Sequence, residues 1–141
     1  MNELIDKRLE GRNTDSVFIT VTRENVRNYC HIIEEENQVF HDLNMAENAG
    51  YLDLPVPTTY PTLFWQYIET PWLTDQASII QTEQNFIYKQ PLIANITYAC
   101  HITLLKVRNR GNKQFLKQRL YIQQAETVIA TSDTTIILQK E

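Results

Sequence analysis

The chain has 141 residues, of which 43% are hydrophobic, so it is long enough for one domain with a buried core and too short for a second. Its first sixteen residues are polar and charged and no run of about 18 apolar residues occurs, so we expect a soluble, unprocessed, cytoplasmic protein without a membrane span. The only cysteines, Cys30 and Cys100, lie far apart, which fits a reducing compartment better than a disulfide framework.

The net charge of −4 conceals an uneven distribution of charge. Residues 84–125 contain seven basic side chains and no acidic one, whereas the rest of the chain sets six basic residues against all 17 acids and carries −11. A basic block on an acidic protein indicates a localised anionic partner, and not general affinity for nucleic acid or membranes. An ordinary solvated face is the alternative. The seven residues are Lys89, Lys106, Arg108, Arg110, Lys113, Lys117 and Arg119.

The first third of the chain is predicted to hold a short strand and an amphipathic helix. Val17–Val21 alternates in polarity as a strand does, and Thr22 is suited to cap the helix that follows. In Arg23–Glu36 the apolar positions 26, 29, 30 and 33 recur at helical spacing. We therefore expect this helix to bury one narrow face.

Two further helices are predicted in the middle of the chain. Asp42–Ala49 begins with a capping aspartate and ends at Gly50, a natural C-terminal stop. Prolines 55, 57 and 61 then require an extended passage and a turn. In Thr59–Glu69 the apolar positions 63, 64, 67 and 68 recur at helical spacing. This segment is apolar enough to be the central helix.

From about Thr82 onward the period of apolar residues changes to two, which predicts strands. Ile96–Val107, Gln114–Gln124 and Thr127–Leu138 are rich in β-forming residues, and the segment 109–112 suits a tight hairpin turn. Helices followed by an antiparallel meander predict an α+β fold in which a sheet wraps one long central helix.

The densest chemical candidate is the acidic stretch before His41. Three carboxylates at residues 34–36 oppose the helix macrodipole and one another, which offers no structural benefit. On a helical wheel Glu36 flanks the apolar stripe and Glu35 points away, so we expect Glu36 to face inward and His41 to return toward it. A carboxylate and an imidazole in one pocket can move water across a polarised double bond. The alternative is a solvated helix end followed by a capping histidine.

The second candidate is the turn Pro57, Thr58, Thr59 and Tyr60, at the start of the apolar helix. A helix N-terminus presents unpaired backbone N–H groups, which can hold a developing oxyanion such as a thioester enolate. The alternative is a rigid turn in which a threonine caps the helix.

Other kinds of site are disfavoured. His31 is predicted on the solvent side of its helix and His101 in the middle of a strand, and neither has metal-ligand spacing to another His or Cys, so we expect no metal site. No Walker loop, GxGxxG or GxSxG motif occurs, which disfavours nucleotide and serine hydrolysis.

Taken in order, these segments resemble the MaoC-like hydratase/dehydratase family, in particular its N-terminal-type hotdog domain. The resemblance runs from about Leu9 to Leu138, although Glu35, Gln38 and Val39 replace a glycine, an asparagine and a proline of the family pattern. The matching residues are Glu36, His41, Asp42, Ala49-Gly50-Tyr51, Val56–Pro61 and Phe86–Leu92.

The resemblance implies one hotdog domain over residues 1–141 that hydrates a trans-2-enoyl thioester to an (R)-3-hydroxyacyl thioester, or dehydrates the product. Glu36 would activate water, His41 would complete proton transfer at the α carbon, and amides near Thr58 to Tyr60 would hold the substrate carbonyl. No cofactor is implied, because the substrate itself carries coenzyme A or phosphopantetheine. The basic block would contact coenzyme A phosphates or an acidic acyl carrier protein.

Three other functions remain open. The chain could be a non-catalytic hotdog subunit that binds the acyl chain while a partner supplies the chemistry. It could be a hotdog thioesterase, although the central helix has no acid before Glu69, or a binding module without a thioester ligand. By resemblance we expect a homodimer, or a heterodimer with a similar subunit.

Overall fold

The computed structural model describes residues 5–73 and 78–139 of the chain. Within these residues the elements are, in chain order, η1 (Lys7–Leu9), β1 (Val17–Thr20), α1 (Arg23–Ile32), η2 (Gln38–Phe40), α2 (Leu43–Asn48), η3 (Tyr60–Tyr67), β2 (Ser78–Tyr88), β3 (Thr97–Arg110), β4 (Lys113–Gln124) and β5 (Thr127–Gln139), where η denotes a 3₁₀ helix.

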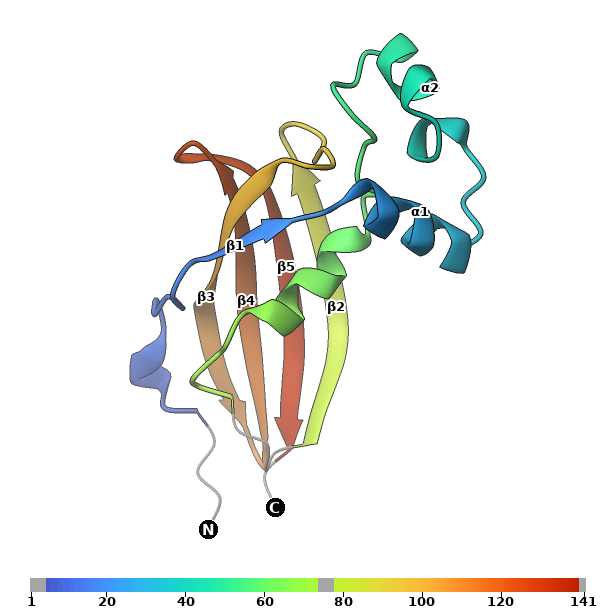
Figure 1. The fold of residues 1–141 in the computed structure, drawn as a ribbon. Coiled ribbons are helices and arrows are strands. Elements are labelled where there is room, and N and C mark those ends of the chain that lie inside the picture. The colour runs from blue at the N-terminus through green and yellow to red at the C-terminus, as the bar shows by residue number, and fades with distance from the viewer. Residues whose placement is uncertain (1–4, 74–77, 140–141) are drawn as a thin grey trace.

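The five strands form one antiparallel sheet in the order β1-β3-β4-β5-β2 (Figure 1). The consecutive strands β3, β4 and β5 make a meander at its centre, and β1 and β2 take the two edges. The predicted α+β fold and its antiparallel meander are confirmed. Among the described residues the outer edge of β2 has no partner strand.

Two tight turns fix the register of the meander. Gly111, with φ +57°, turns β3 into β4 where the hairpin is predicted, and Ala125 and Glu126, with φ +48° and +69°, turn β4 into β5. Residues with a left-handed backbone conformation in short hairpin loops match the twist of the flanking strands. As a result Phe115 lies opposite Arg108 on one side and Ile137 on the other.

Alternation along the strands separates a buried inner face of the sheet from an outer face. On β4 the even-numbered residues 114–122 are buried, whereas the odd-numbered residues between them are partly or fully exposed. The alternation of apolar and polar residues in the sequence of this strand therefore corresponds to the buried and exposed faces of the sheet.

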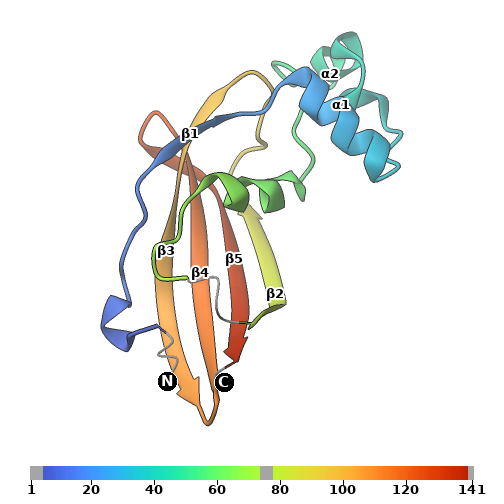
Figure 2. The ribbon, with the colours of Figure 1, turned by 60° about the horizontal axis from the view of Figure 1, so that its bottom comes forward.

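η3 crosses the inner face of the sheet and buries Pro61 and Phe64 against it (Figure 2). It is the central helix predicted over Thr59–Glu69, but it is only eight residues long and has 3₁₀ geometry. Its aromatic and threonine side chains are weak helix formers, so packing against the sheet holds it in place. After η3, Trp72 Nε1 donates to Gln118 Oε1 at 2.7 Å and ties the following loop to β4.

α1 and α2 lie beyond one end of the sheet (Figure 1). α1 starts with a capping box at Thr22, and the carboxylate of Asp42 caps α2, both as predicted. Arg23 donates to the Asp53 carboxylate at 2.8 Å, and this hydrogen bond lowers the pKa of Asp53. The ion pair anchors α1 to the segment that leads back to the sheet.

α1 ends at Ile32, four residues before the predicted end. The Glu34 amide donates to the His31 oxygen at 3.3 Å, and the Glu35 amide donates to the Cys30 oxygen at 2.8 Å, which together form a Schellman turn. Glu34 takes the left-handed position of this turn, with φ +58°. Glycine usually occupies that position, so the sequence lacks the ordinary stop signal.

Two hydroxyl groups are buried on the inner face of β5 without a hydrogen-bond partner among the described residues. They are Ser132 Oγ and Thr134 Oγ1, on side chains that are 0% and 5% exposed. A buried hydroxyl without a partner loses its hydrogen bonds to water on folding, so both groups should lower stability.

Replacing Glu34 with glycine should raise the free energy of unfolding by about 1 kcal/mol, because glycine adopts the left-handed conformation without a Cβ penalty. Urea denaturation measures the change. Glu34→Ala is the control, because it removes the same charge and keeps the Cβ. Equal stabilisation by alanine and glycine would show that repulsion among the carboxylates, and not backbone strain, is relieved.

Thr134→Val should raise the free energy of unfolding by about 1 kcal/mol, because valine keeps the shape of threonine without its unpaired hydroxyl. Trp72→Phe is the contrasting variant and should cost about 1–2 kcal/mol, because it leaves Gln118 Oε1 buried without its donor. Both are measured by urea denaturation. Destabilisation by Thr134→Val would instead mean that the hydroxyl binds a buried water.

Candidate functional site

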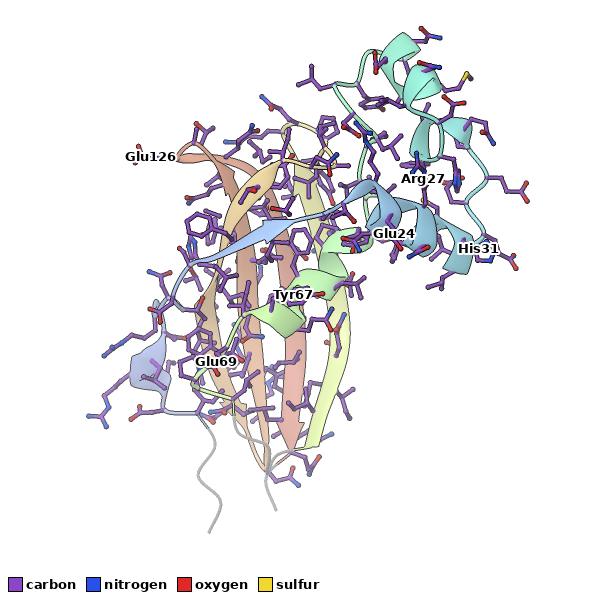
Figure 3. All side chains as sticks on the ribbon, viewed as in Figure 1. Glu24, Arg27, His31, Tyr67, Glu69 and Glu126 are labelled. Carbon is purple, nitrogen blue, oxygen red and sulfur yellow. The ribbon has the colours of Figure 1, made fainter. Side chains whose placement is uncertain are left out.

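His41 follows η2 directly, and its ring turns back toward the end of α1. Its Nε2 lies 2.8 Å from the backbone oxygen of Glu35. A carbonyl oxygen can only accept, so Nε2 carries the proton in this bond and Nδ1 of the neutral ring keeps a lone pair. Arg27, on α1 (Figure 3), donates from Nε to the His41 oxygen at 3.0 Å. α1 therefore holds both the ring and the backbone of His41.

Glu36 is exposed, and among the described residues its carboxylate has no hydrogen bond or ion pair. The expectation that Glu36 faces inward is wrong, because α1 ends at Ile32 and the helical wheel does not extend to residue 36. The half-buried acid is Glu35, whose Oε2 accepts from the Asn37 amide at 3.3 Å.

Glu36 and His41 nevertheless border one open depression of about 990 Å³ between the end of α1 and η2. Its other lining residues are Cys30, His31, Glu34, Glu35 and Gln38. An acid and an imidazole on one concave surface can share the proton transfers that hydration or dehydration needs. The structure places both residues at the border of one depression, and their chemical roles stay predictions.

Cys30 borders the same depression but is suited to packing and not to nucleophilic attack. Its side chain is fully buried in the core. Burial, with a smaller effect from Glu35, raises the pKa of the Cys30 thiol, so it stays protonated at neutral pH. The acid–base groups of the depression are therefore its carboxylates and histidines.

The second predicted segment, Pro57 to Tyr60, does not border this depression. The Tyr60 amide donates to the Pro57 oxygen at 2.9 Å, so it is not open to a substrate carbonyl. Thr59 precedes η3 without capping it through its side chain. Tyr60 instead lines a separate depression of about 400 Å³ beside β1 and η3, together with Phe18.

Two tyrosine hydroxyls, which the sequence did not single out, hold this segment in place. Tyr29 on α1 shares a hydrogen bond of 2.6 Å with Thr59, and Tyr88 on β2 donates to the Thr58 oxygen at 2.5 Å. The Tyr29 ring also meets the Tyr60 ring edge-on, with centroids 4.9 Å apart. Burial raises the pKa of Tyr88, so it remains a donor. In the sequence these tyrosines are indistinguishable from core aromatics.

The remaining histidines lie where the sequence predicts. His31 is exposed on α1 (Figure 3), and His101 is half-buried on β3, stacked on Tyr121 with centroids 4.9 Å apart. Across residues 5–73 and 78–139, no three His, Cys, Asp or Glu side chains gather closely enough to hold a metal ion. In the same residues no helix combines the length and apolar character needed to cross a membrane.

Residues 8–132 match the family described as FAS1-like, dehydratase domain region. Among curated proteins, a UPF0336 protein of Thermobifida fusca is 27% identical over 126 residues, covering 84% of this chain and 83% of the relative. A UPF0336 protein of Parafrankia is 28% identical over 113 residues, covering 75% of each chain.

Three solved structures have the same fold. The HadBC (3R-hydroxyacyl-ACP dehydratase) complex of Mycobacterium tuberculosis superposes with a TM-score of 0.82 at 19% identity, covering 92% of this chain and 96% of the matched one. The ChsH1–ChsH2 complex of the same organism gives 0.75 at 14% identity, covering 95% and 86%. An (R)-hydratase from A. caviae gives 0.71 at 14% identity, covering 90% and 94%.

These likenesses establish the hotdog fold, and the match to a family description over residues 8–132 establishes the family. The resemblance to MaoC-like dehydratases found in the sequence is thereby confirmed. The chain belongs to the FAS1-like, dehydratase domain region family, and it has the hotdog fold of solved MaoC-like dehydratases.

Proposed function

We propose that this chain is a cytoplasmic hydro-lyase subunit that interconverts a trans-2-enoyl thioester and an (R)-3-hydroxyacyl thioester. The observation that carries the proposal is that Glu36 and His41 border one depression. Membership of a dehydratase family and the (R)-hydratase among the structural neighbours support the same reaction class.

In hydration, Glu36 takes a proton from water as the water oxygen bonds to carbon 3 of the enoyl group. His41, protonated at Nδ1, gives its proton to carbon 2, while its Nε2 keeps the hydrogen bond to the Glu35 oxygen. The two residues return to their starting protonation states by exchange with solvent, and dehydration runs the same steps backward. Adding water changes no net oxidation state, so the reaction needs no redox cofactor. We propose that the two side chains act without a metal and that the substrate carries coenzyme A or phosphopantetheine.

A second hotdog subunit is part of this proposal. The depression at Glu36 and His41 is open to solvent, and a hydro-lyase needs an enclosed site that excludes bulk water. The unpaired edge of β2, with Ile80 58% and Ile87 62% exposed, is suited to pairing with another strand. The partner is a second copy or a similar chain, as in the complexes of two hotdog chains among the neighbours.

A second candidate function is a non-catalytic subunit that binds the acyl chain while its partner supplies the acid and the base. One observation favours it. The Glu36 carboxylate is exposed and nothing in the described residues orients it, whereas a catalytic carboxylate is normally held by neighbouring groups.

The loss of the enoyl-thioester absorbance band on adding crotonyl-coenzyme A tests the two candidates. Glu36→Gln and His41→Asn should each lower kcat by about 10²–10⁴-fold, because each removes a proton-transfer group. Glu34→Gln is the matched control, because it removes a neighbouring carboxylate of the same depression and should retain activity. Turnover that survives both substitutions would refute the proposed roles of Glu36 and His41, whereas no turnover with enoyl chains of several lengths would favour the non-catalytic subunit.

Pairing along β2 is tested by the mass of the purified chain in sedimentation equilibrium. We expect a dimer, and Ile80→Lys with Ile87→Lys should reduce it to one chain of 16.6 kDa. Ile32→Lys is the control, because it makes the same change at a residue that is 77% exposed and lies on α1. A wild-type chain that is already monomeric would identify the partner as a different subunit.

A further inference from the structure

The basic residues of the second half of the chain gather on the outer face of the sheet, near the β3–β4 hairpin. The side chains alternate with the buried residues of their strands, and all five are exposed. They form what we call the basic face, which consists of Lys106, Arg108 and Arg110 on β3 and Lys113 and Lys117 on β4.

The basic face is hollowed at its centre. A depression of about 380 Å³ is lined by four of its cations together with the half-buried Phe115 and with Thr135. Phe115 pairs with Arg108 across the β3–β4 ladder and with Ile137 across the β4–β5 ladder. An apolar floor is therefore surrounded by a cationic rim.

The five positive charges of this face outnumber the acids beside it, one of which is Glu10, whose carboxylate accepts from the Val107 amide of β3 at 2.8 Å. Lys106 lies directly opposite Lys117, and Arg110 directly opposite Lys113. Like charges in facing positions of an antiparallel pair are destabilising, so folding alone does not favour this arrangement.

The one acid in the central strands of this face, Asp133, is already engaged. It accepts from Arg119 Nε at 2.6 Å and lies 3.8 Å from Lys117 Nζ. In residues 5–73 and 78–139, Lys106, Arg108 and Arg110 make no ion pair. Glu83 on the edge strand β2 stands opposite Thr135, at the border of the face. The charge on β3 therefore remains available to an anionic partner.

The basic face is also separate from the Glu36/His41 depression. The β3–β4 hairpin lies at the end of the sheet opposite to α1 and α2 in both views (Figures 1 and 2). The basic face therefore does not form the rim of that depression, and a ligand bound there serves another purpose.

The spacing of the cations fits an acidic helix. Alternate residues of a strand are about 6.6 Å apart, so Lys106, Arg108 and Arg110 repeat at nearly the same distance as carboxylates four residues apart on a helix, about 6 Å. The floor around Phe115 suits an apolar side chain from the same helix face. Small ligands usually bind in enclosed pockets, whereas a broad, open face suits contact with the surface of another protein.

We propose that the basic face docks an acidic, amphipathic helix of another protein, independently of the thioester reaction. The probe is a fluorescein-labelled helical peptide with glutamates at every fourth position and leucines beside them, titrated with the full chain and followed by anisotropy. We expect saturable binding that weakens as salt rises, because exposed charges are screened.

Arg108→Glu should weaken binding of this peptide at least about tenfold, since it reverses a charge at the centre of the face. Lys89→Glu is the matched control, because it makes the same charge change on an exposed residue just beyond β2 and should leave affinity unchanged. The affinity of Arg108→Gln should lie between those of the wild type and Arg108→Glu, and an unchanged circular dichroism spectrum would show that the fold is intact.

Three results would overturn the proposal. The first is equal weakening by Lys89→Glu and Arg108→Glu, which would indicate non-specific attraction. The second is no binding of the peptide at low salt. The third is tighter binding of a single-stranded RNA oligonucleotide, adenosine 3′,5′-bisphosphate or phosphatidylglycerol vesicles than of the peptide, which would assign the face to a phosphate ligand.

Discussion

The register between β3 and β4 is the constraint on which the rest of the structure depends. It places Ile102 opposite Leu120 on the buried face and Lys106 opposite Lys117 on the outer face. A slip of one residue would exchange the two faces, burying lysines and exposing leucines. Because this would bury several unpaired charges, the register is firmly specified. A bulge between Leu104 and Lys106 shifts the register by one residue, so the core depends on the pairing before the bulge and the basic face on the pairing after it.

The same register determines which side chains of the sheet face η3. It places Gln118 on the inner face, where its amide oxygen accepts a hydrogen bond from Trp72 Nε1. Without that hydrogen bond the buried Gln118 side chain would lower the free energy of unfolding. With it, the loop after η3 is bound to β4. A short 3₁₀ helix, which has little stability of its own, is held between this bond and the hydroxyl contacts of Tyr29 and Tyr88 at its start.

Local signals were enough to predict the sheet and not enough to predict the candidate site. The strands were predictable because their period of two and the turn at Gly111 are both local. The end of α1 was not, since Glu34 takes a left-handed conformation that usually requires glycine, and the helix-based expectation for Glu36 failed with it. The 3₁₀ form of η3 and the roles of Tyr29 and Tyr88 depend on contacts between distant segments, which no local pattern encodes.

The turn at Glu34 also determines what chemistry the chain can perform. It brings the Glu35 oxygen to Nε2 of His41, which fixes the imidazole and leaves Nδ1 with its lone pair. The carboxylate of Glu36 receives no comparable support, so the described chain orients one of the two proposed proton-transfer groups and leaves the other exposed to water. Effective acid–base catalysis needs both groups held and water excluded. The pair can therefore act only where water is excluded from this depression, and the second subunit that we propose would supply the cover.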